Sequence, residues 1–216
     1  MAGARAKSGI YGGRTAEQRR AERRGKLIDA ALEIWQEHGW AAVSMRGVCA
    51  QAGLIDRYFY ESFADRDELL VAVWDKVRDE MFGLLLESIS DVSDHPPLVQ
   101  LRSAIEVLVH RLVEHPRHAQ IIFGEHAGSP ALEQRRQETL QRATDMLGQL
   151  ARPFLRADVD ENGFRMTVLM GIGGFYELIS AWRAGIVRAD ADQIIEQAAR
   201  LGETLGAQYL PGHRAE

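Results

Sequence analysis

Residues 53–63, GLIDRYFYESF, combine hydrogen-bonding side chains with four aromatic rings in eleven positions. Arg57 offers a planar guanidinium, which can donate to the edges of bases. Tyr58, Tyr60 and Ser62 offer hydroxyl groups, which can donate to phosphate oxygens. The charges within the stretch argue against a buried strand, and its rings argue against a surface loop. These residue types suit the recognition of a nucleic acid.

The stretch spans the end of one short predicted helix and the whole of the next. Ser44 is a strong N-cap for a helix over 45–52, and Gly53 suits the turn that closes it. The next helix should run from about residue 56 to residue 62. Two short helices joined by a glycine-containing turn form a helix-turn-helix, whose second helix enters the major groove. One face of this helix must then pack on the preceding helices, and the other must lie against DNA.

The charge distribution supports a polyanionic partner at one end of the chain. The net charge is −5, but residues 1–26 carry eight Lys and Arg against two Glu. Residues 1–66 have eleven basic and eight acidic residues, while residues 67–216 have fifteen basic and twenty-three acidic ones. Such asymmetry predicts a basic end that meets DNA and an acidic body that does not. The alternative interpretation of the charge alone is a solvated tail without a partner.

Helical periodicity extends over most of the chain, and no alternating strand pattern is found. Thr15 with Gln18 resembles a capping box, and it opens a helix that should end at Gly39. Prolines then mark the changes between helices in the body. The sequence therefore predicts an all-α fold of about nine helices. The body should begin with a long helix that carries an apolar stripe from Leu69 to Leu85. The helices that follow should span about 98–113, 117–123, 132–150, 161–184 and 190–209.

Three regions are expected from these patterns. Residues 1–14 lack periodicity and should form a flexible basic arm that acts through the release of counterions. Residues 15–66 should form the helix-turn-helix domain. Residues 67–216 should form a helical domain for effector binding and dimerisation.

Several classes of protein are disfavoured by composition. No apolar run reaches the roughly 20 residues that a membrane span needs, and the N-terminus has no apolar signal region. The single cysteine, Cys49, excludes an internal disulfide and a multi-cysteine zinc site, and it should be a small buried hydrophobe. A soluble cytoplasmic protein without a membrane partner is expected.

Residues 26–74 resemble the DNA-binding domain of the TetR family of transcriptional repressors. The resemblance is carried by EHGW after the first helix, by the hydroxyl of Ser44, by AG at the turn, by YFYESF, and by DRDELL at the start of the fourth helix. It covers roughly a quarter of the chain, and the spacing of every element fits. The remaining helices match the family in number and length only.

The resemblance implies roles for individual residues. Ser44 and Arg46 would meet the phosphate backbone, and Arg57 and Tyr58 would face bases. The other phosphate contacts would come from Tyr60, Ser62 and Arg66. Packing rather than DNA contact is the alternative for Tyr60.

The chain departs from the family pattern at the start of the second short helix. Ile55 stands where the family usually has Ser or Thr, and an isoleucine side chain cannot cap. Asp56 is therefore expected to take over the cap one position later. The family often has Lys at the position of Asp56, where a carboxylate should repel phosphates unless it caps or accepts from a cytosine amino group.

The body is rich in methionine and aromatic residues, which have two interpretations. At helical spacing most of them should be core, but a subset could line a pocket for an apolar ligand. Glu125 is a further polar candidate. The candidate ligand-binding residues are Trp74, Met81, Phe123, His126, Met146, Met170 and Tyr176.

Catalytic and metal-dependent functions find little support. His115 and His118 lie three residues apart, but Pro116 disrupts their geometry and no ligand set is complete. The glycines of 171–174 lack the lysine of a phosphate-binding loop, and they should instead permit the close approach of a neighbouring helix. No enzymatic activity, metal or cofactor is expected.

The combined interpretation is a DNA-binding repressor that a small, mostly apolar ligand releases from a palindromic, double-stranded DNA operator. A homodimer is expected because paired half-sites require a two-fold axis, and it should be built on residues 164–182 and 194–209. The mechanism would be steric, since the ligand would favour a spacing of the recognition helices that no longer fits the operator. The alternative is a small all-α enzyme or carrier with a basic tail.

Overall fold

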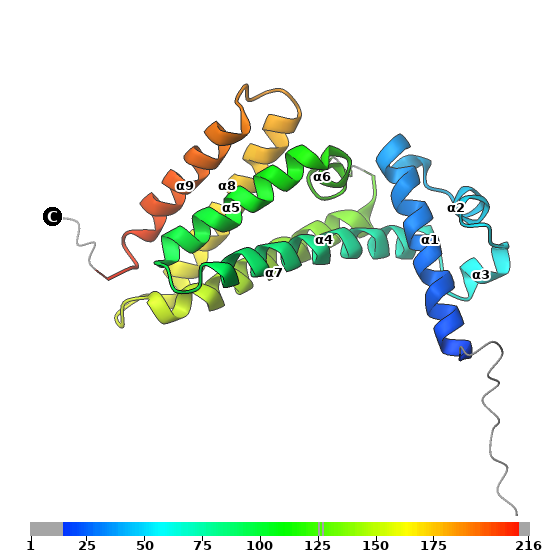
Figure 1. Cartoon of the computed structure of the whole chain (residues 1–216), viewed down its shortest axis with the longest axis horizontal. Helices are drawn as coiled ribbons and strands as arrows, with labels where there is room; N and C mark the ends of the chain where they lie inside the picture. The colour runs from blue at the N-terminus through cyan, green and yellow to red at the C-terminus, as the bar shows by residue number, and fades with distance from the viewer. Residues whose placement is uncertain (1–14, 125, 127, 212–216) are drawn as a thin grey trace, which may run out of the picture. The chain divides into compact units, whose positions relative to one another are not determined.

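The computed structural model of the chain describes residues 15–124, 126 and 128–211. Over these residues it contains nine α-helices and two short 3₁₀-helices, with no strand (Figure 1). The prediction of an all-α fold with about nine helices is confirmed. None of the described helices combines the length and the apolar composition that crossing a membrane requires.

The chain divides into two compact units, Met1–Asp75 and Lys76–Glu216. We refer to them as the N-terminal unit and the C-terminal unit. The boundary between the units falls inside helix α4, Arg66–Asp91. The first turns of α4 belong to the N-terminal unit because they contribute fully buried side chains there, namely Leu69, Leu70, Val73 and Trp74.

Local signals set the helices of the N-terminal unit. The side chain of Thr15 accepts from the backbone N–H of Gln18, and the side chain of Gln18 accepts from that of Thr15, so the predicted capping box is confirmed. Gly39, with φ of 81°, ends this first helix. The elements before α4 are α1 (Ala16–His38), the 3₁₀-helix η1 (Trp40–Ala42), α2 (Met45–Ala52) and α3 (Asp56–Tyr60).

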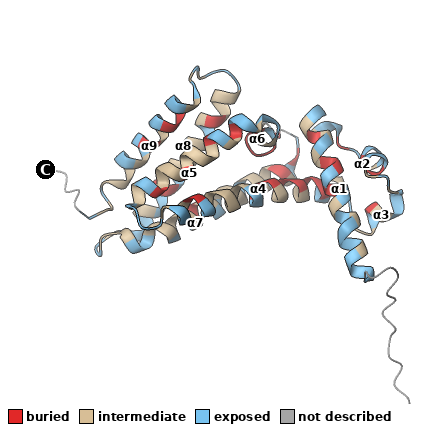
Figure 2. Cartoon of the chain, in the orientation of Figure 1, coloured by how far each residue is buried: buried red, intermediate tan, exposed pale blue. Residues whose placement is uncertain are grey.

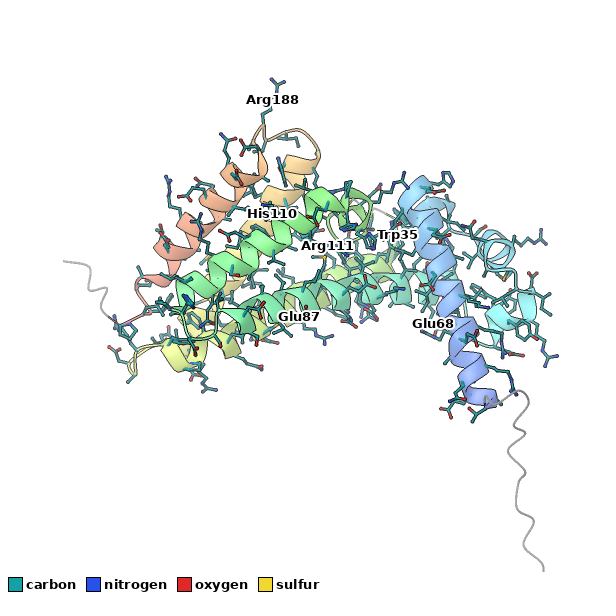
Figure 3. The ribbon with its side chains drawn as sticks, in the orientation of Figure 1. Trp35, Glu68, Glu87, His110, Arg111 and Arg188 are labelled. Carbon is teal, nitrogen blue, oxygen red and sulfur yellow. The ribbon has the colours of Figure 1, made fainter. Side chains whose placement is uncertain are left out.

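A small apolar core joins α1, α2 and α3. Trp35 of α1, labelled in Figure 3, is fully buried, and Figure 2 shows buried positions on all three helices. The rings of Phe59 and Phe63 pack at 5.7 Å between centroids. Cys49 is buried as expected, and its burial is the main reason why the pKa of its thiol is raised. Packing in this core holds the inner face of α3 against α1 and α2 and leaves its other face outward.

Prolines begin three helices of the C-terminal unit. Pro97, Pro116 and Pro130 each stand in the first turn, where the missing N–H of proline costs nothing. The elements that follow α4 are α5 (Pro97–Glu114), α6 (Pro116–Phe123), α7 (Pro130–Ala151), the 3₁₀-helix η2 (Arg152–Phe154), α8 (Glu161–Arg183) and α9 (Ala191–Gly206).

Within this unit α5 packs on α9, and α7 packs on α8 (Figure 1). Gly202 of α9 permits a close approach to α5, because an added Cβ there would lie 2.6 Å from a methyl of Leu101. The glycines of 171–174 contribute less than expected. An added Cβ on Gly171 would meet a methyl of Leu205 at an ordinary 3.5 Å, and Gly173 and Gly174 face open space.

Candidate nucleic-acid interface

The turn between α2 and α3 has the geometry that its sequence predicts. Ser44 caps α2, because its Oγ accepts from the backbone N–H of Gly47 at 3.2 Å. Gly53 has φ of 64° and ψ of 33°, the left-handed conformation in which a Cβ is disfavoured. The N–H of Leu54 then bonds to the carbonyl of Cys49 at 2.9 Å, which closes the end of α2. This turn places α3 directly after α2.

Helix α3 begins at residue 56 as expected, but its N-cap and its last residue differ from expectation. Ile55 occupies the N-cap position with extended backbone angles and makes no side-chain cap bond. The expectation that Asp56 would cap is wrong, because Asp56 is already the first helical residue and only its charge suits the helix N-terminus. The helix ends at Tyr60, earlier than predicted, and Ser62 and Phe63 then both donate their N–H groups to the carbonyl of Phe59.

The expected base-facing residues have different environments. The side chain of Arg57 is 80% exposed, and its Nε donates to Oε1 of Glu61 at 3.0 Å. Tyr58 is only half-exposed, and the guanidinium of Arg23 lies 4.4 Å above its ring. Tyr60 is exposed and also touches the edge of the Phe59 ring. Arg57 and Tyr60 therefore remain available to a partner.

Two arginines of α1 also reach α3, although their positions in the sequence indicate only a basic charge. Arg23 donates to Oε2 of Glu61 at 3.3 Å, and Arg20 donates to the backbone carbonyl of Glu61. We call the set of Arg20, Arg23, Arg57 and Glu61 the arginine cluster. The signal for it in the sequence is the spacing of Arg19, Arg20, Arg23 and Arg24 along one helix, but the partner lies about forty residues away.

The other expected phosphate contacts divide into exposed and inward-facing groups. Ser44 and Arg46 are exposed at the start of α2. The Oγ of Ser62 is buried and has no hydrogen-bond partner among the described residues. Arg66 donates from Nε to the carbonyl of Val43 and from Nη2 to that of Trp40, each at 2.5 Å. Its guanidinium thus binds protein backbone in this structure.

A small cavity in the C-terminal unit lies between α4 and the α5–α6 segment. Its volume is about 10 Å³, and apolar side chains including Met81 line it together with Glu80, Arg111, His115 and His118 (Arg111 is labelled in Figure 3). Such a volume holds about one water molecule. Burial is the main reason why the pKa of His118 is lowered, with the nearby Arg111 and His115 adding to the effect. Met81 is the candidate ligand residue that lines this cavity.

Three other candidates meet at the end of α6. Tyr176 of α8 donates its hydroxyl to the carbonyl of Ile122 at 3.0 Å, and its ring lies 5.1 Å from that of Phe123. Burial raises the pKa of Tyr176 to about 12, so it stays a neutral donor. His126 is buried, and desolvation lowers the pKa of its imidazole. Tyr176 therefore ties α8 to the last turn of α6.

The remaining candidates are dispersed. Trp74 is fully buried and falls in the N-terminal unit, while Met170 is 64% exposed on α8. Met146 is half-buried on α7. Glu125 and the basic arm over 1–14 lie outside the described residues.

Comparison with known proteins identifies the N-terminal part of the chain. Residues 27–73 match the sequence model of the bacterial regulatory proteins of the tetR family. The HTH-type transcriptional activator FasR of Mycolicibacterium smegmatis is 27% identical over 104 residues, which are 48% of this chain and 47% of that protein. The match thus spans about half the length of this curated relative.

Solved structures share the fold of nearly the whole chain. FadR of Bacillus subtilis in complex with stearoyl-CoA has a TM-score of 0.62 at 18% identity, covering 82% of this chain and 96% of that one. SmeT, the repressor of the Stenotrophomonas maltophilia multidrug efflux pump SmeDEF, has a TM-score of 0.65 at 20% identity, covering 89% and 93%. The sequence match over 27–73, together with the helix-turn-helix geometry described above, identifies the N-terminal unit as a DNA-binding domain of the type found in the bacterial regulatory proteins of the tetR family.

Proposed function

We propose that this protein is a homodimeric repressor that leaves a palindromic operator when a small, mostly apolar ligand binds its C-terminal unit. The observation that carries the DNA-binding part is the exposed face of α3, where Arg57 and Tyr60 stand directly after the Gly53 turn. Arg57 would read base edges, while Ser44, Arg46 and Tyr60 would meet phosphates. A DNA target also implies a cytoplasmic location.

The proposed dimer rests on an apolar surface of α8. Met166, Leu169 and Met170 are large apolar side chains that are exposed in the single chain. Their spacing of three and four residues places them on one face of the helix, and Gly173 continues this face with open space beside it. Leu201 is likewise exposed on α9. A second copy of the chain would cover such a surface through a two-fold interface.

Light scattering tests the dimer. The wild type should give twice the chain mass of 24.2 kDa at micromolar concentration. Met170→Glu should shift the mass toward one chain, because an unpaired carboxylate would be buried in the interface. Leu86→Glu is the control, since Leu86 is 45% exposed but lies on α4. Equal masses for both variants and the wild type would remove α8 from the interface.

An acyl-CoA thioester is the first ligand class to test, because the FadR structure that shares this fold holds stearoyl-CoA. The cavity of about 10 Å³ is far smaller than the roughly 300–1,000 Å³ of ordinary ligand sites. The ligand must therefore favour a conformation in which α4 and the α5–α6 segment separate. Since α4 carries both Met81 and Arg66, a shift of this helix would involve both units.

The function is tested in two steps. A duplex enriched from a random library by the wild-type protein should bind more tightly than a scrambled duplex, and stearoyl-CoA or a shorter acyl-CoA should weaken that binding. By linkage, the same duplex must weaken acyl-CoA binding by the same factor. If acyl-CoA affinity is the same with and without the duplex, acyl-CoA is excluded as the effector, while the proposal of DNA binding stands. In a reporter assay, expression should fall when the duplex overlaps the promoter, and a rise would indicate an activator such as FasR.

A further inference from the structure

Glu61 is an acidic residue placed at the end of the helix that should lie against DNA. It accepts a guanidinium on each of its carboxylate oxygens, from Arg57 at 3.0 Å on Oε1 and from Arg23 at 3.3 Å on Oε2. Its backbone carbonyl accepts from Arg20. One residue thus connects two arginines of α1 to the base-facing arginine of α3.

The contact constrains Arg57 in a way that suits base recognition. Arg57 and Glu61 are four residues apart, so the ion pair holds the long side chain along one face of the helical turn. The bond uses Nε, which leaves the two Nη groups as a planar pair of donors on a side chain that is 80% exposed. Two such donors match the O6 and N7 acceptors of guanine in the major groove. Holding the guanidinium in advance lowers the rotamer entropy that is lost when it binds.

A carboxylate in this position must also repel phosphates. The cluster nevertheless has three arginines against one carboxylate, a net charge of +2. Glu61 has two simpler possible roles. It could be a weak structural tie, an ion pair that holds α1 against α3, or it could only reduce the positive charge of the surface. Neither role would alter the preference for one DNA sequence over another in a variant that stays folded.

We propose that Glu61 is a positioning residue that holds Arg57 for base readout and so raises sequence specificity at the expense of general affinity for DNA. The inference rests on the proposed function, because base readout requires an operator. The Glu61 side chain is 32% exposed, so water still screens its ion pairs, and such pairs contribute little to stability. Removal of Glu61 should therefore leave the protein folded.

The experiment compares four variants on two DNA probes. The probes are the duplex enriched by the wild type and a scrambled duplex of the same length, measured at one salt concentration. The variants are Glu61→Ala, Arg57→Ala, the double variant of both, and Asp56→Ala. Asp56 is the matched control, because it carries the same charge as Glu61 at the opposite end of α3 and takes no part in the arginine cluster.

Both charge-removing variants, Glu61→Ala and Asp56→Ala, should bind the scrambled duplex a few-fold more tightly. Only Glu61→Ala should lower the ratio of specific to non-specific affinity, by about fivefold or more, the lower end of what one bidentate base contact contributes. The double variant should have the same ratio as Arg57→Ala alone, because Glu61 acts through Arg57. A fifth variant, Glu61→Gln, keeps an acceptor oxygen and should retain part of the ratio that Glu61→Ala loses.

Several outcomes would overturn the inference. An unchanged ratio in Glu61→Ala would leave Glu61 as a repulsive charge, and additive effects in the double variant would separate it from Arg57. A ratio lost together with the thermal unfolding transition would assign Glu61 to the structural tie. If the wild type enriches no sequence at all, the proposed function and this inference fail together. If the wild type does enrich a sequence but Glu61→Ala leaves the ratio of specific to non-specific affinity unchanged, this inference fails and the proposed function stands.

Discussion

Replacing Arg66 by alanine removes a side chain that joins the first residue of α4 to the segment between α1 and α2. The guanidinium donates to the carbonyls of Val43 and Trp40, each at 2.5 Å, and lies 5.3 Å from the centre of the Trp40 ring. The family resemblance assigns Arg66 to a phosphate. The contacts instead favour a clamp that closes the N-terminal unit.

The expected loss of stability follows from these contacts. A hydrogen bond from a charged donor contributes about 1.5–3 kcal/mol when buried. Arg66 is half-buried, so water can replace part of each bond, and the two bonds together should contribute about 1.5–2 kcal/mol. The position of the guanidinium beside the Trp40 ring adds about 0.5–1 kcal/mol. Arg66→Ala should therefore destabilise the N-terminal unit by about 2–3 kcal/mol.

Urea unfolding followed by tryptophan fluorescence measures this loss, because three of the four tryptophans, Trp35, Trp40 and Trp74, lie in the N-terminal unit. Arg46→Ala is the matched control, since Arg46 is exposed on α2 of the same unit. It should unfold with the wild type but bind DNA more weakly, with a salt slope that is smaller by about one. Arg66→Ala should unfold at a lower urea concentration than the wild type. At a temperature where it is folded, it should bind DNA with an unchanged salt slope.

Arg66→Lys separates charge from geometry. Lysine keeps the charge but cannot bond two carbonyls with a planar fork, so it should recover only a minor part of the stability. The clamp is refuted if Arg66→Ala unfolds with the wild type while its salt slope falls by about one. Arg66 would then be a phosphate ligand, as the family resemblance implies.

Three further predictions concern the turn, the α6–α8 contact and the buried histidines. Gly53→Ala should lower the free energy of unfolding by about 1–2 kcal/mol, because Gly53 has a φ of 64°. Gly25 lies on α1 beside open space, so Gly25→Ala should raise the free energy of unfolding by about 0.5–1 kcal/mol. Urea unfolding that shows changes of the same sign for both variants would contradict this prediction. Tyr176→Phe should cost about 1 kcal/mol in the C-terminal unit, because a carbonyl in the last turn of α6 loses its donor, and an unchanged urea midpoint would contradict that role. Burial holds the pKa of His118 and of His126 below the ordinary 6.5, so the unfolded chain binds more protons. The stability that this provides should be complete above about pH 6.5 and decrease as the pH falls below it; urea midpoints that stay constant between pH 7.5 and 5 would exclude it.

Residue type and local spacing account for the features that depend on neighbours a few positions away. The capping box of Thr15 and Gln18, the cap of Ser44 and the left-handed Gly53 are all local, and each has one favourable geometry for its residue type. The apolar periodicity likewise predicted the helices of both units to within a few residues at their ends. The second helix of the helix-turn-helix, which is proposed to face DNA, could therefore be located from the amino-acid sequence alone, although Ile55 and Asp56 show that a local rule fails where the favoured residue is missing.

Contacts between distant parts of the chain set which polar groups remain free. Arg57 and Arg66 have the same side chain, yet one is exposed beside Glu61 and the other binds carbonyls 23 and 26 residues earlier in the chain. Arginine has several rotatable bonds and can point outward or inward, so its direction depends on partners that only folding brings near. The same holds for Tyr176, whose acceptor is 54 residues away. Residue type and spacing predict where a functional surface lies, while long-range hydrogen bonds determine which of its side chains a ligand can reach.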